Sequence, residues 1–267
     1  MDVDFFLSFV LFLIGVATVF LYSKLGKKAE TVLGGQELKL KLGHIVLLVA
    51  AMGIMVYVLV FIPDQSLVAL FSFAYVMVLF LFTYMFAPKL YLAAVPPVLF
   101  LFLFFYCWNI YFFDIFAVIF GVGITVYMGT LFTWKTTLAF VSLLTVVDII
   151  QVLVTGFTVV SAQKALDLGL PVGVILPTIP CTDAYTFLGL GDIFFLGLLA
   201  VQSTQKYGKR FGYTCVAVMA LVFFVFQTAM LNSEFENFPA TVFIISGWVV
   251  SLVARYLYGM FSSKKLV

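Results

Sequence analysis

Long apolar stretches, separated by short groups of charged residues and prolines, follow one another along almost the whole chain. Most are about 20 residues long, the length that a helix needs to cross a hydrocarbon core roughly 30 Å thick. Residues 98–108 are apolar at every position, whereas a strand of a transmembrane barrel would alternate apolar and polar side chains. The pattern therefore predicts membrane-spanning helices and an all-α polytopic membrane protein.

Nine such helices fit between the charges and prolines, and the division between the fourth and fifth falls at Trp108 and Asn109. The predicted spans are approximately 5–22, 44–62, 67–87, 90–108, 110–132, 137–159, 184–203, 211–231 and 239–259. We expect residues 1–267 to form a single membrane domain. Its parts are the first six helices in 1–160, an outer loop at 161–183 and the last three helices in 184–267.

Composition supports this class of protein and excludes several others. The chain is 65% hydrophobic and 10% charged, against roughly 25% charged residues in soluble domains. The three cysteines (Cys107, Cys181 and Cys215) are scattered singly, which predicts neither a metal site nor a redox motif. His44 is the single histidine, so a zinc protease that needs two histidine ligands is excluded. No metal and no cofactor are expected.

The charges are distributed unevenly between alternate connections. Of the 14 basic residues, 13 fall in loops after odd-numbered spans or at the C-terminus, and Lys164 is the exception. The positive-inside rule then predicts an outer N-terminus and a cytoplasmic C-terminus. Because these basic residues lie next to helix ends, topology explains them better than a nucleic-acid partner does.

The connection at about 160–183 is unusual for an outer loop. Residues 168–180 are too apolar for a solvated linker and too rich in proline and glycine for a helix. Residues 172–176 fit either a short strand at the membrane surface or an irregular interfacial loop.

Two aspartates, Asp148 and Asp192, lie inside the sixth and seventh predicted spans. A carboxylate in hydrocarbon is costly, so it usually faces a bundle interior or a wet cavity. At about 1.5 Å per residue, Asp148 lies roughly 16 Å and Asp192 roughly 12 Å from the outer ends of their helices. Because helices joined by a modest loop are usually neighbours, the two carboxyl groups are expected to meet.

Helical periodicity predicts a polar stripe on each of these two spans. The stripes consist of Thr145, Asp148, Gln151 and Thr155 on the sixth span and Thr186, Gly189 and Asp192 on the seventh. Two carboxyl groups a few Å apart share a proton, so one can activate water while the other protonates a leaving amide nitrogen. The alternative is a pair of interhelical hydrogen bonds without catalysis.

Three short motifs carry a resemblance to a known family. Gly189-Leu190-Gly191-Asp192 resembles the GxGD motif of the presenilin and signal peptide peptidase family of intramembrane aspartyl proteases. Val147-Asp148 lies where that family usually has Tyr-Asp, and Phe238-Pro239-Ala240-Thr241 is similar to its Pro-Ala-Leu motif. The layout of nine spans, with motifs on the sixth, seventh and ninth, also fits.

The resemblance implies specific roles. Asp148 and Asp192 would be the catalytic pair, Gly189 and Gly191 would let substrate approach the seventh helix, and Leu190 would line that approach. The ninth helix would shape the active site through Pro239, Ala240 and Thr241. Two departures, Val147 for Tyr and Thr241 for Leu, leave both carboxylic acids in place, so they bear on efficiency and specificity more than on the type of reaction.

The resemblance also implies a cellular setting. The predicted orientation matches signal peptide peptidase and is opposite to presenilin, which favours type II or signal-peptide-like transmembrane substrates. The expected partners are these substrates and the lipid bilayer, with no nucleic acid, and the oligomeric state is not indicated. The compact chain resembles archaeal members, which implies a multi-pass protein of a prokaryotic cell membrane.

Two alternatives stay open from the residues alone. One is a prepilin-type GxGD peptidase, although such proteins usually have fewer spans. The other is a proton-coupled transporter or ion pathway, in which Asp114 joins Asp148 and Asp192 in a relay. Asp114 is otherwise expected to be interfacial. A serine protease is disfavoured because the chain has no GxSxG motif and its histidine lies at the inner edge.

Overall fold

The computed structural model describes residues 4–32, 39–179, 185–232 and 239–264. Cys181 and Phe238 lie outside these ranges. The described elements, in chain order, are α1 (Phe6–Val32), α2 (Leu42–Phe61), α3 (Asp64–Phe86), α4 (Leu90–Tyr106), α5 (Ile110–Leu131), α6 (Trp134–Ile149), the π-helical segment η2 (Ile150–Val154), α7 (Phe157–Asp167), β1 (Gly173–Pro177), β2 (Tyr185–Gly189), α8 (Leu190–Tyr207), α9 (Lys209–Leu231) and α10 (Ala240–Lys264).

Helices dominate, as the apolar stretches predict. Within the described ranges, seven helical segments are long and apolar enough to cross a membrane: α1, α2, α3, α5, α6 with η2, α9 and α10. α4 is apolar but has 17 residues, and the 18 residues of α8 include several polar side chains. A polytopic membrane protein is therefore confirmed. The count of nine stays a prediction, because it requires α4 and α8 to cross as well.

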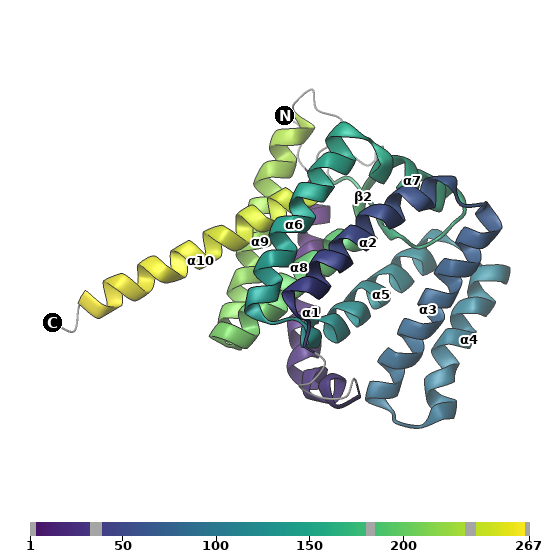
Figure 1. Cartoon of the computed structure of the whole chain (residues 1–267), viewed down its shortest axis with the longest axis horizontal. Coiled ribbons are helices and arrows are strands. Elements are labelled where there is room, and N and C mark those ends of the chain that lie inside the picture. The colour runs from purple at the N-terminus through teal and green to yellow at the C-terminus, as the bar shows by residue number, and fades with distance from the viewer. Residues whose placement is uncertain (1–3, 33–38, 180–184, 233–238, 265–267) are drawn as a thin grey trace.

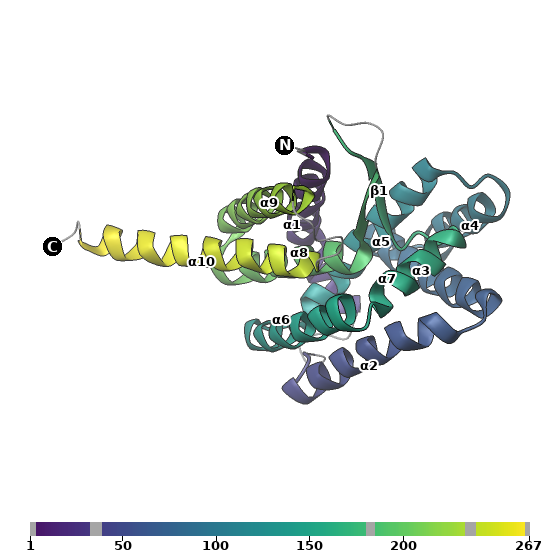
Figure 2. The same ribbon diagram turned by 90° about the horizontal axis from the view of Figure 1, so that it is seen from above.

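α8 forms the centre of the bundle, because α1, α5 and α9 pack around it. Its residues 195–200 are all buried. A Cβ on Gly197 would lie 2.6 Å from Cγ2 of Thr125, so α5 approaches this helix very closely. α3 and α4 pair on one side of the molecule and α9 and α10 on the other, and α10 extends beyond the bundle (Figures 1 and 2).

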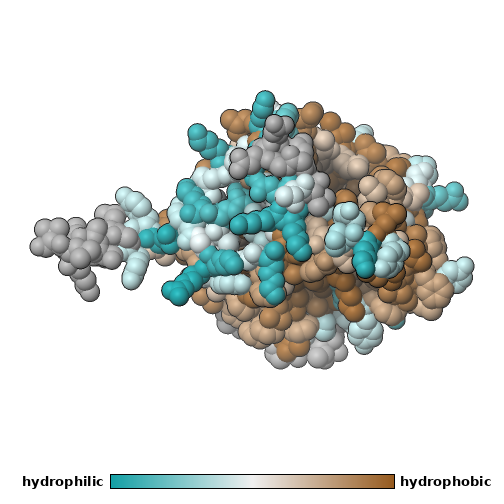
Figure 3. Space-filling model, turned by 90° about the horizontal axis from the view of Figure 1, so that it is seen from below, coloured by the Kyte–Doolittle hydropathy of each residue, from teal (hydrophilic) through white to brown (hydrophobic). Residues whose placement is uncertain are grey.

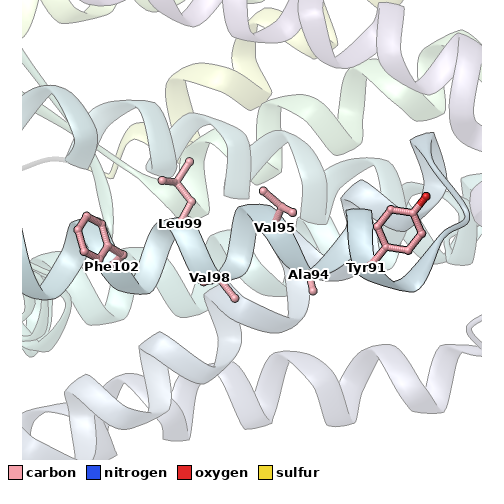
Figure 4. Close-up of a pocket in the computed structure, with 6 residues that line it drawn as sticks. All are labelled: Tyr91, Ala94, Val95, Val98, Leu99 and Phe102. Carbon is pink, nitrogen blue, oxygen red and sulfur yellow. The ribbon is translucent and has the colours of Figure 1, made fainter.

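The outer face of α4 is hollowed by an open groove of about 500 Å³. Figure 4 shows that one helix supplies its lining, which consists of Tyr91, Ala94, Val95, Val98, Leu99 and Phe102. Apart from the hydroxyl of Tyr91, these side chains are apolar. We therefore assign this groove to the apolar surface that a bilayer would cover.

The sixth predicted span ends earlier than expected. α6 changes to a π-helix at Ile150, and Gly156, with a φ of 68°, begins a new helix in the left-handed conformation. The prediction of a helix to residue 159 is wrong because this glycine turns the chain within an apolar run. The expected outer loop therefore contains the helix α7 and the strand β1.

The seventh predicted span also differs. Residues 185–189 form the strand β2, which pairs antiparallel with β1 and places Gly173 opposite Gly189 and Ile175 opposite Phe187. The short strand considered for residues 172–176 is confirmed as β1, which runs beside α5 (Figure 2). The placement of Thr186 and Gly189 on one helical face with Asp192 is wrong, because both residues precede α8.

Basic side chains of different connections meet at one end of the bundle. Lys39 donates to the carbonyl of Thr130 (2.6 Å), and the Nζ of Lys206 lies 3.8 Å from the ring centre of Trp134. α1 continues to Val32, further than predicted, and reaches the same end. Figure 3 shows hydrophilic residues gathered on part of the surface, beside a large apolar area. The connections that follow α1, α5 and α8 thus lie at the same end of the bundle, as the predicted topology requires. That this end faces the cytoplasm stays a prediction.

Candidate active site on helices α6, α8 and α10

Asp148 lies at the last turn of α6, immediately before the helix widens. The N–H of Thr155 bonds to the carbonyl of Ile150 (3.0 Å), five residues earlier, which is the π-helical pattern. Such segments are rare and occur frequently at functional sites. The Asp148 side chain is half-buried, so it is neither sealed in the core nor fully open.

Asp192 lies in the first turn of α8, which follows β2 without a connecting loop. Gly189 precedes the helix, and its backbone N–H faces the carboxylate of Asp192, three residues further on. This is half of a capping box, in which the third helical residue satisfies the N–H of the capping residue. The turn from strand to helix therefore fixes where the Asp192 carboxyl group points.

The two aspartates lie on helices that pack against each other. α6 contacts α8, and Asp148 is near enough to Asp192 for its charge to be felt there. Asp192 is also half-buried. The pair thus occupies a contact between two helices and keeps a partly exposed side.

The start of α10 completes this arrangement. The hydroxyl of Thr241 donates to Oδ2 of Asp148 at 2.6 Å, while only 5% of Thr241 is exposed. Pro239 is buried and directly precedes the helix, and Ala240 packs against the core. A residue that replaces the family's usual Leu therefore becomes a direct hydrogen-bond partner of Asp148.

The glycines on either side of Leu190 have different surroundings. A Cβ on Gly189 would lie 3.3 Å from Oδ2 of Asp192, whereas a Cβ on Gly191 would meet nothing within 4 Å. Gly191 thus leaves open space beside the carboxyl pair. Leu190 is half-buried and packs among core side chains near Gly121 of α5, and its role in lining the approach stays a prediction.

The remaining polar residues of the sixth span make their hydrogen bonds away from Asp148. Thr145 donates to a carbonyl within α6, and Thr155 donates back to the carbonyl of Gln151. Gln151 donates to the carbonyl of Gly53 in α2 (2.9 Å). Val147 also faces this glycine, because a Cβ on Gly53 would lie 3.4 Å from its Cγ1. The smaller side chain at position 147 therefore lies where α2 packs closely on α6.

Sequence reasoning missed two acidic anchors next to the site. Asp4, close to the predicted outer N-terminus, is fully buried and bonds to Thr186 of β2. Asp114, expected at the interface, accepts from the N–H of Ile175 in β1. The sequence of residues 185–189 shows no alternation of polar and apolar side chains that could have identified β2.

Comparisons with known proteins were made for the sequence and for the fold. No protein-family model matches the chain, and no curated protein matches its sequence. A solved structure of a presenilin-family intramembrane aspartate protease matches with a TM-score of 0.65. The match covers 92% of this chain and 99% of that one, at 14% sequence identity.

The chain has the presenilin-family fold. The resemblance inferred from the three motifs is thereby confirmed in its architecture, and at 14% identity the likeness concerns architecture alone. Within this presenilin-like fold, the first turn of α8, the end of α6 and the start of α10 converge on the two aspartates. The archaeal affinity stays a prediction.

Proposed function

We propose that this protein is an intramembrane aspartyl protease in which Asp148 and Asp192 hydrolyse peptide bonds of transmembrane helices. The observation that carries the proposal is the placement of these two aspartates on the packed helices α6 and α8, within electrostatic reach of each other, in a presenilin-like fold. A proton shared between them supplies a base to activate water and an acid to protonate the leaving nitrogen. The residues require no cofactor for this reaction.

β2 supports the proposal because it offers a place for an extended substrate. The N–H of Leu190 bonds to the carbonyl of Val172, so alternation turns the N–H and C=O of Phe187 away from β1. Among the described residues, no third strand covers this edge, and the side chain of Phe187 is 38% exposed. An unwound peptide that pairs here continues past the open space at Gly191 to the two aspartates.

The finer features of the proposal come from the charge pattern and the resemblance. We expect nine spans, with α4 and α8 crossing the membrane, an outer N-terminus and a cytoplasmic C-terminus. In that orientation, helices that enter with their N-terminus inside match the site, so type II proteins and signal peptides are the proposed substrates. Position 147 differs from the family's usual Tyr and would affect specificity through the α2–α6 contact.

A cleavage assay in liposomes tests the function. The purified protein should cut a labelled transmembrane peptide, and Asp148→Ala and Asp192→Ala should each reduce the rate by roughly 100- to 10,000-fold or more. Asp64→Ala is the matched control, because Asp64 is an exposed residue that pairs with Lys164 (3.5 Å) at the start of α3. Proton movement across the liposome without cleavage would instead support the transporter alternative and refute the protease.

A further inference from the structure

β1 is attached to the helices through a side chain that bonds to its outer edge. Oδ1 of Asp114, on α5, accepts from the N–H of Ile175 at 2.8 Å. Because Ile175 and Phe187 form a pair that does not exchange backbone hydrogen bonds, this N–H points away from β2. Asp114 therefore provides the partner that β2 cannot provide.

The chain just before β1 is attached in the same way. Nε1 of Trp108 donates to the carbonyl of Gly169 at 2.8 Å, and the hydroxyl of Tyr75 donates to the carbonyl of Pro171. Tyr75 is fully buried between α3 and its neighbours. Side chains of α3, of α5 and of the connection before α5 thus hold one side of the hairpin.

β2 is attached from the opposite side by the N-terminal residues. Oδ2 of Asp4 accepts from the hydroxyl of Thr186 (3.1 Å) and from Nε2 of Gln227 on α9 (2.9 Å). Oδ1 of Asp4 accepts from the N–H of Phe6 (3.0 Å), and Ser8 donates to the Gln227 amide oxygen (3.1 Å). A carboxylate with no exposed surface is thus held by three donors, and it joins α1, β2 and α9.

These anchors act on the strand that leads into the catalytic helix. Thr186 precedes Asp192 by six residues, and β2 continues into α8 through Gly189. A slip of one residue in the pairing would turn Thr186 away from Asp4 and would move Gly189, against which the Asp192 carboxylate packs. An isolated two-stranded hairpin is marginally stable at best, so its register depends on such external contacts.

We propose that Asp4 and Asp114 are positioning residues that hold the β1–β2 hairpin in register before a substrate binds. The two carboxylates bond to opposite strands, and they belong to the N-terminal segment and to α5, which are far apart in the sequence. β2 then presents its free edge and Asp192 in a fixed relation to each other. The effect of this positioning on cleavage rests on the proposed function. The proposal that the hairpin is formed before substrate binds does not depend on that function.

Hydrogen exchange of the substrate-free protein tests the preformed hairpin directly. In the wild type, the amides of Thr186 and Leu188, which face β1, should exchange at least about 100-fold more slowly than in an unstructured peptide. Exchange at unstructured rates would overturn the proposal, whether or not the protein is a protease. This measurement needs no variant, so it stays decisive if a substituted protein fails to fold.

Two pairs of variants assign the effect to the anchors. Thr186→Val keeps the side-chain shape and β propensity but removes the donor to Asp4, whereas Thr186→Ser keeps it. Asp114→Leu removes the acceptor for Ile175, whereas Asp114→Asn keeps an oxygen in its place. We expect Thr186→Val and Asp114→Leu to accelerate amide hydrogen exchange in the hairpin by roughly tenfold or more. Thr186→Ser and Asp114→Asn should exchange at rates close to the wild type.

The same variants separate positioning from general stability in the cleavage assay. If the hairpin positions substrate, Thr186→Val and Asp114→Leu should raise KM and spread the cuts over several neighbouring bonds, as mass spectrometry of the products would show. An equal loss of kcat and thermal stability, with an unchanged KM and a single cut, would show a merely structural role and contradict the proposal.

Discussion

The hydroxyl of Thr241 gives the sharpest test of how Asp148 works. Thr241→Val keeps nearly the same shape in a position that is 5% exposed, but it removes the donor that lies 2.6 Å from Oδ2 of Asp148. A hydrogen bond to a charged group contributes roughly 1.5–3 kcal/mol, and burial leaves little room for water to replace it. Since about 1.4 kcal/mol is tenfold in rate, cleavage should slow by roughly 10- to 150-fold.

The kinetic signature distinguishes this role from packing. In the proposed function Asp148 belongs to the proton-sharing pair that acts in the chemical step, so the loss should appear in kcat while KM stays within about threefold. Thr241→Ser retains the hydroxyl and should stay within about fivefold of the wild type. Steady-state cleavage of the labelled peptide and thermal unfolding of each variant are the measurements. A Thr241→Val protein that folds normally and keeps the wild-type kcat would refute this role.

Three further predictions concern substrate access, packing and orientation. Gly191→Val should leave thermal stability nearly unchanged, because nothing lies within 4 Å of an added Cβ. The same substitution should raise KM by roughly tenfold, because the new side chain fills the proposed substrate path. An unchanged KM would contradict that path. Gly247→Ala should destabilise the protein by about 1–3 kcal/mol, because its Cβ would lie 2.6 Å from the Cα of Met219, whereas Gly43→Ala, with open space around it, serves as the control in thermal unfolding. A tag at the N-terminus should be digested by protease added outside intact cells, and protection of that tag would reverse the orientation.

The sequence was sufficient to predict most helices and the placement of Asp148 and Asp192 on neighbouring helices. Apolar runs bounded by charges locate membrane helices because the bilayer demands both length and apolarity. The two aspartates were recognisable because a carboxylate is rare in such runs. Both inferences depend only on which residues occur within a short stretch of chain, and these can be read from the sequence.

The hairpin was not predictable in the same way. Residues 185–189 are as apolar as the helix that follows, and β2 is a strand because it pairs with β1, from Pro177 opposite Tyr185 to Gly173 opposite Gly189. The role of Asp4 depends on Thr186 and Gln227, which lie more than 180 positions along the chain. The contact of Thr241 with Asp148 likewise needs α10 to meet α6. Tertiary pairing decided each of these features.

The most direct test of the account is a double-variant cycle on the catalytic pair. Asp148→Asn, Asp192→Asn and the combined variant should be compared in single-turnover cleavage of one transmembrane peptide. If the two carboxyl groups act as one unit, the combined variant should lose no more than about threefold beyond the more damaging single variant. A combined variant whose loss of rate equals the product of the two single losses would contradict a shared catalytic site. A single variant that cuts near the wild-type rate would also contradict it.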